Sequence, residues 1–180
     1  IIWNYEALKG AEQATPISIA IHVEVDGKSL GQKVRTFSVR SINECLLGYV
    51  SNGTNFHDTG IFFAAYVNED NPMIDKLLRE ALNTRIVNRF LGYQSARPEA
   101  VDKQVYALWN VLQKRKFRYS SVSNTSLSSN VVYSQRVRTF DDALESSQIN
   151  CVDGSVLIAS LLRAINIDPI LVRTPGHMFV

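Results

Sequence analysis

The segment Ser146–Val180, SSQINCVDGSVLIASLLRAINIDPILVRTPGHMFV, holds two residue types that can carry out nucleophilic catalysis. Cys151 is one of only two cysteines among 180 residues, and His177 is the last of three histidines. An imidazole beside a thiol accepts the thiol proton and later returns a proton to the leaving group. Cys151 and His177 are therefore the candidate catalytic pair of the chain.

The residues around Cys151 predict that it opens a helix. Asn150 is a favoured N-cap residue, and Asp153 lies where a carboxylate can bond back to the cap. The apolar spacing continues to Ile165, and Asn166 can take the left-handed conformation that ends a helix. Free backbone N–H groups at a helix start favour a thiolate and can hold a developing oxyanion.

The residues after this helix predict a hairpin that ends at the histidine. A strand over 170–173 and a turn at 174–176 precede a second strand that begins at His177. A helix that returns to a sheet by so short a connection can bring His177 next to Cys151. We interpret Asp153 as a cap rather than a catalytic group.

The remaining cysteine and histidines have no comparable context. We interpret Cys45 as a small packed hydrophobe, His22 as lying on the polar face of its strand, and His57 as part of a polar loop. Two dispersed cysteines make no disulfide framework and no CxxC pair, and the spacing fits no metal ligand set, so we expect no metal and no cofactor.

The rest of the chain alternates between strand and helix signals. ISIAIHVEV alternates strictly between apolar and polar residues and predicts a half-buried strand, followed by a turn at Asp26-Gly27. Asn71-Pro72 predicts a helix start. The full expectation is strands over 17–25, 34–42 and 60–67 (the last with a helix start as the alternative), helices over 72–90 and 98–116, a Ser/Asn-rich loop over 120–134, and a helical turn over 140–144.

The composition is that of an ordinary globular protein and excludes some classes of partner. Hydrophobic residues make up 46% of the chain, charged residues 20%, and the net charge is +2. This charge is too small to indicate a nucleic-acid partner. No apolar run approaches the roughly 20 residues that a membrane-spanning helix needs.

The segment from Val101 to Val180 resembles the transglutaminase-like superfamily of papain-like thiol enzymes, in its bacterial form. The resemblance is carried by the order and spacing of four stretches, NCVDGS, LIASLLRA, IDPILV and PGHMFV. It implies an α+β fold with the nucleophile at the N-terminus of a helix that packs on an antiparallel sheet. A β-rich region with one long helix (1–95) would precede the transglutaminase-like core (96–180), with one fused domain as the alternative.

The resemblance also implies roles for individual residues. Cys151 would be the nucleophile and His177 the general base and acid. Gln148, just before the nucleophile, is a candidate second oxyanion donor, with a surface loop residue as the alternative interpretation. In the family a later strand carries the Asp or Asn that orients the imidazole, so we expect that group beyond Val180 and weak or no activity in this chain. The His177 strand would then have a free edge, open to a missing segment or to another chain.

Two functions follow as expectations. The first is amide hydrolysis, as a peptidase or amidase, or acyl transfer through a thioester on Cys151, with a peptide or other amide as substrate. The second is a catalytically inert version of the same fold that serves as a binding or structural module. Family resemblance associates such proteins with a bacterial cell envelope or a secreted location.

Overall fold

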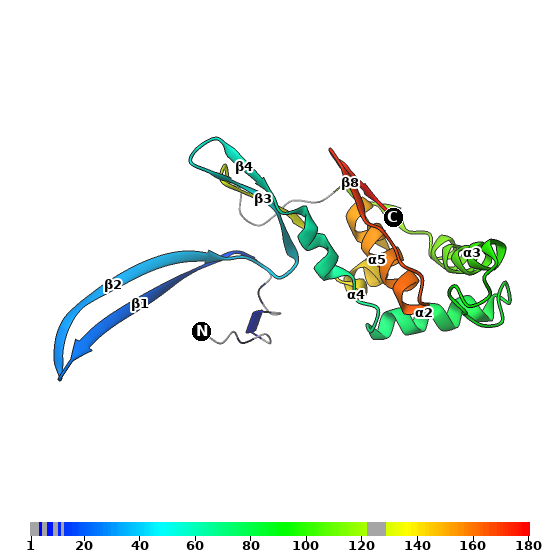
Figure 1. The fold of residues 1–180 in the computed structure, drawn as a ribbon, viewed down its shortest axis with the longest axis horizontal. Coiled ribbons are helices and arrows are strands. Elements are labelled where there is room, and N and C mark those ends of the chain that lie inside the picture. The colour runs from blue at the N-terminus through cyan, green and yellow to red at the C-terminus, as the bar shows by residue number, and fades with distance from the viewer. Residues whose placement is uncertain (1–3, 5–6, 9–10, 12, 122–128) are drawn as a thin grey trace.

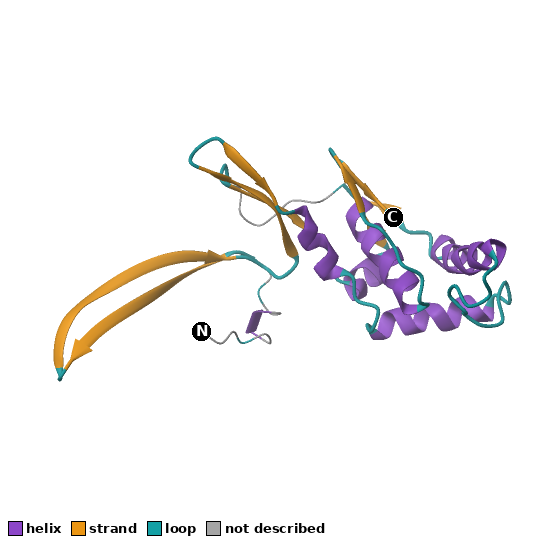
Figure 2. Cartoon of the chain, in the orientation of Figure 1, coloured by secondary structure: helices purple, strands orange, loops and turns teal. Residues whose placement is uncertain are grey.

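The computed structural model describes residue 4, residues 7–8, residue 11, residues 13–121 and residues 129–180. The protein is a mixed α+β structure, and the described strands form several small sheets, three of which are antiparallel. Figure 2 shows the helices gathered in one body, from which a long two-stranded ribbon projects. The body carries the candidate site.

The projecting ribbon consists of β1 (Thr15–Val25) and β2 (Lys28–Val39), paired antiparallel around the expected turn at Asp26-Gly27 (Figure 1). The prediction of a strand over 17–25 is confirmed, but the prediction that it is half-buried is wrong over most of its length. Ile21 and Val23 are exposed, because no described element covers the apolar face of the ribbon. Strict alternation indicates a two-faced strand but does not supply the layer that buries one face.

A second sheet has the strand order β4-β3-β6 and lies beside the helical body. Its strands are β3 (Glu44–Ser51), β4 (Asn55–Asp58) and β6 (Val132–Arg136). The predicted loop over 120–134 is therefore wrong at its end, where β6 begins, and its residues 122–128 lie outside the described residues. His57 lies on β4 rather than in a loop, where it stacks on Tyr49 and hydrogen-bonds Ser51.

The apolar run after β4 forms η1 (Gly60–Tyr66), a 3₁₀ helix rather than the predicted strand. Only Phe63 on this helix is buried, and Ile61 is 80% exposed. An apolar run without a clear period does not distinguish a strand from a helix. η1 runs beside α5 and contributes Phe63 to the core.

The helical body contains α2 (Pro72–Asn83), α3 (Pro98–Lys114), α4 (Phe140–Ser146) and α5 (Cys151–Ala164). The predicted start of α2 is confirmed, since the Asn71 side chain accepts a hydrogen bond from the Met73 N–H. The predicted end near Phe90 is wrong, because Arg85 adopts a left-handed φ of 60° that terminates the helix.

Helix α5 lies at the centre of the core and is buried on most of its faces. It contacts η1, α2 and the last strand of the chain. One hydrophobic core joins residues of α2, α3 and α5, and so spans the chain on both sides of residue 95. The division into two domains stays a prediction.

The remaining strands are short. β5 (Arg118–Tyr119) pairs in parallel with β7 (Gln148–Ile149), and β8 (Val172–Thr174) pairs antiparallel with β9 (His177–Phe179). The predicted hairpin at the end of the chain is thus confirmed, with a turn at Gly176. Among the described residues, no helix is both long and apolar enough to cross a membrane.

Candidate active site

Cys151 is the first residue of α5, as the sequence predicts. The Asn150 side chain accepts a hydrogen bond from the Asp153 N–H at 2.9 Å, and the Asp153 carboxylate accepts one from the Asn150 N–H at 3.0 Å. This reciprocal capping box fixes the first turn of the helix. Asp153 therefore has the predicted role of a cap, and Cys151 is held at a defined helix start.

The Asp153 carboxylate also binds a residue that the sequence analysis missed. It accepts hydrogen bonds from the Arg138 backbone N–H at 2.9 Å and from the Arg138 Nη1 at 2.6 Å. The same guanidinium donates through Nη2 to the Ser120 hydroxyl at 3.1 Å. These bonds join the segments that contain Ser120 and Arg138 to Asp153, which lies two residues after Cys151.

His177, the first residue of β9, lies at the same cavity as Cys151. Met178 anchors β9, because its side chain is buried in the core between exposed neighbours. Cys151 and His177 both line a cavity of about 260 Å³, together with residues of β3, β6 and the β8–β9 hairpin. A cavity of this size holds a reacting group rather than a whole drug-sized ligand. The structure therefore brings the predicted pair to one cavity wall.

The two side chains are not joined directly. Among the described residues, no hydrogen bond links the Cys151 thiol to the His177 ring, and none orients that ring. The ring stacks instead on Phe179, with ring centroids 6.3 Å apart. Catalytic hydrogen bonds are often long in an unliganded enzyme, so this geometry leaves the pairing of the two residues as a prediction.

Tyr119 is a further neighbour of Cys151 in this cavity. The negative charge of the Cys151 thiolate raises the pKa of the Tyr119 hydroxyl, as do, to a smaller extent, desolvation and a hydrogen bond between the two side chains. The Tyr119 hydroxyl is therefore a hydrogen-bonding group close to the Cys151 sulfur.

The structure does not place Gln148 in the cavity. Gln148 lies exposed on β7, where it pairs with Arg118 of β5, and it is not among the lining residues. The glutamine that does line the cavity is Gln135, half-buried on β6 opposite Cys45. The exposed position of Gln148 fits its alternative interpretation as a surface residue, whereas Gln135 reaches the cavity through the pairing of β6 with β3.

Backbone donors are also present at the nucleophile. Among the described residues, no hydrogen bond occupies the N–H groups of Cys151 and Val152, the first two residues of α5. Such donors at a helix start can hold a developing oxyanion.

The other cysteine is a structural residue, as the sequence analysis interprets it. Cys45 lies on β3, is 2% exposed and belongs to the core. Burial raises the pKa of its thiol to about 11. Both cysteines are free thiols, so the structure contains no disulfide between Cys45 and Cys151.

Comparisons with known proteins give no assignment. No family model, no curated protein and no solved structure matches this chain. In the described part of the chain, no cluster of three or more His, Cys, Asp or Glu residues could hold a metal ion. The candidate site therefore rests on its own residues.

Proposed function

We propose that the chain is a transglutaminase-like thiol enzyme that hydrolyses an amide or transfers its acyl group through a thioester on Cys151. The observation that carries this proposal is that Cys151 of α5 and His177 of β9 line the same cavity. The capping box that fixes the helix start at Cys151 and the Tyr119 hydroxyl in the same cavity add support.

The proposed reaction has two stages. In the first, the imidazole of His177 takes the thiol proton, and the sulfur attacks the amide carbon. The carbon–nitrogen bond then breaks, and the leaving amine takes the proton from the imidazolium. In the second stage, water (for hydrolysis) or another amine (for acyl transfer) attacks the thioester and releases the thiol.

The tetrahedral intermediate carries a negative oxygen that needs donors. The free N–H groups of Cys151 and Val152 are candidates on the helix side. The side-chain amide of Gln135 is a candidate on the β6 side of the cavity. This role passes from Gln148 to Gln135, because only Gln135 lines the cavity.

An inert binding module is the second candidate function. It is favoured by one observation, namely that no described residue hydrogen-bonds the His177 ring to orient it. In a catalytic triad the orienting group fixes the imidazole tautomer, and its loss severely reduces the rate.

Acylation by p-nitrophenyl acetate separates the two functions. We expect a slow burst of p-nitrophenolate that corresponds to one acyl group per chain, because a thiol enzyme accumulates its thioester and no described residue orients the His177 ring. Peptide mass spectrometry after an acid quench should place the acetyl group on Cys151. Cys45→Ala should keep the burst, whereas Cys151→Ala should abolish it and His177→Ala should slow it.

Two results would overturn the enzyme proposal. One is a burst of the same size in Cys151→Ala. The other is acetylation of Cys151 at the rate of the same residue in the urea-unfolded chain. Either would leave the inert module as the better account.

A further inference from the structure

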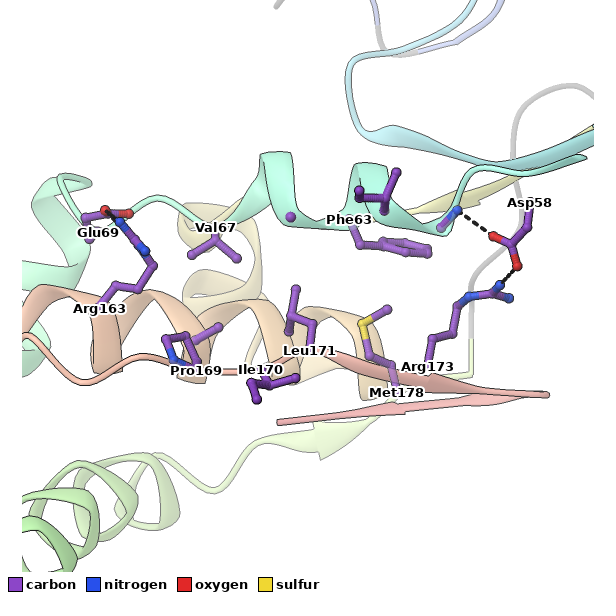
Figure 3. A pocket seen from close by; sticks show the side chains of 14 residues that line it. Asp58, Phe63, Val67, Glu69, Arg163, Pro169, Ile170, Leu171, Arg173 and Met178 are labelled. Atoms are coloured by element: carbon purple, nitrogen blue, oxygen red, sulfur yellow. Dashed lines mark hydrogen bonds and ion pairs between the residues drawn. The ribbon is translucent and has the colours of Figure 1, made fainter.

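A second and larger cavity adjoins the one that holds Cys151. Its volume is about 750 Å³, and it runs between η1 and the extended segment Pro169–Arg173 (Figure 3). Its middle is apolar, and an ion pair lies at each end. Phe63, Arg173 and Met178 line both cavities, so these three side chains form the boundary between them.

Of these three boundary residues, Arg173 alone is charged, and its guanidinium is held by Asp58. Its Nη2 forms an ion pair with Asp58 Oδ2, while the Gly60 N–H donates to Asp58 Oδ1 at 2.7 Å. A Cβ atom on Gly60 would lie 2.7 Å from the Arg173 Nε. The absence of a side chain at Gly60 thus leaves space for the guanidinium at the boundary between the two cavities.

The ion pair that holds Arg173 is partly open to solvent. The side chains of Arg173 and Asp58 are 34% and 55% exposed, and exposed ion pairs contribute little net stability. Among the described residues, the guanidinium makes no other side-chain hydrogen bond, so several of its donors remain available. Since Gly60 holds Asp58 independently, Arg173 can turn to another carboxylate while Asp58 stays in place.

We propose that Arg173 is a carboxylate subsite, so that the substrate of Cys151 is an amide that carries a carboxylate close to the scissile bond. The inference rests on the proposed function, because it names the substrate class of the same site. The planar guanidinium matches a carboxylate with two parallel hydrogen bonds, which an ammonium does not. Arg173 would be a specificity residue and not part of the bond-breaking chemistry.

The rate of Cys151 alkylation by iodoacetate, relative to the rate with neutral iodoacetamide, measures the preference of the site for a carboxylate. The ratio cancels the intrinsic reactivity of the thiol and reports the local preference for a carboxylate. We expect Arg173→Gln to lower the ratio by about two- to fivefold and Asp58→Asn to raise it by a similar factor. Arg173→Lys should keep part of the preference for iodoacetate, because it keeps the positive charge but cannot form two parallel hydrogen bonds to a carboxylate.

The ion pair at the other end of the larger cavity supplies a matched control. Arg163 Nη2 lies 2.7 Å from Glu69 Oε1, and both residues line only the larger cavity. Arg163→Gln removes the same charge as Arg173→Gln and should leave the ratio at Cys151 unchanged.

Three results would overturn the proposal. The ratio could be equal in the wild type and in Arg173→Gln. Both alkylation rates could fall together, which would mean that Arg173 only stabilises the thiolate. Arg163→Gln could lower the ratio as much as Arg173→Gln, which would indicate a diffuse field and no subsite. Failure of the proposed function is distinguishable, because it would appear as indifference of both rates to His177→Ala while the ratio still depended on Arg173.

Discussion

The Arg138 guanidinium and the Asp153 carboxylate form a buried ion pair, with 2.6 Å between Nη1 and Oδ2, next to the candidate nucleophile. The carboxylate accepts from the Arg138 backbone as well, and it also caps the helix that begins at Cys151. One side chain therefore fixes both the start of α5 and the segment that precedes α4.

We predict that Arg138→Met lowers the free energy of unfolding by about 3–5 kcal/mol, because it leaves a carboxylate buried without its partner. Urea denaturation followed by circular dichroism measures this change. Glu69→Gln breaks the exposed pair with Arg163 and serves as the control, which should change stability far less. Equal effects of the two substitutions would contradict the structural role of Arg138.

A second prediction concerns the two glutamines. Gln135→Ala should slow the acylation of Cys151 by p-nitrophenyl acetate by about tenfold or more, because it removes an oxyanion donor from the cavity. Gln148→Ala should leave the rate unchanged, since Gln148 lies outside the cavity. The reverse ranking would restore Gln148 to the site and remove Gln135 from it.

A third prediction follows from the buried thiol. Burial raises the pKa of Cys45 from 9.0 to about 11, so the unfolded chain loses this proton first as the pH rises. Between those values the folded state binds more protons, and the free energy of unfolding falls as the pH increases. The contribution of Cys45 is fully present below about pH 9 and is lost through about pH 11.

Urea midpoints measured across this alkaline range test the third prediction. Cys45→Ala should flatten the decline, although it lowers the overall stability by opening space in the core. An unchanged slope in Cys45→Ala would show that other groups, such as the half-buried Tyr66, cause the alkaline loss.

The elements that the sequence predicts best are those with local signals. Asn71-Pro72 and Asn150 each mark a helix start by a cap, and both starts are observed at the predicted residue. Capping and helical spacing depend on residues within one or two turns, which the sequence contains in full. The helix start beneath Cys151 and the hairpin before His177 are predictable for this reason.

The elements that the sequence predicts poorly depend on distant parts of the chain. The segment Gly60–Tyr66 forms a 3₁₀ helix that buries Phe63 in a core shared with α5, which lies far away in the sequence. The start of β6 at Val132 lies within a Ser/Asn-rich stretch and forms a strand through its pairing with β3. Gln135 lies on β6 and Arg138 lies just after it. Because the position of β6 depends on its pairing with β3, sequence spacing could not assign either residue to the site.

In the proposed enzyme His177 activates Cys151, and the rate of iodoacetamide alkylation tests this role most directly. Cys45 and Cys151 are quantified separately by peptide mass spectrometry between about pH 6 and pH 7, in the wild type and in His177→Ala. We predict that Cys151 reacts far faster than Cys45 and that His177→Ala slows Cys151 alone. A Cys151 that reacts like an ordinary thiol and is indifferent to His177→Ala would contradict the account.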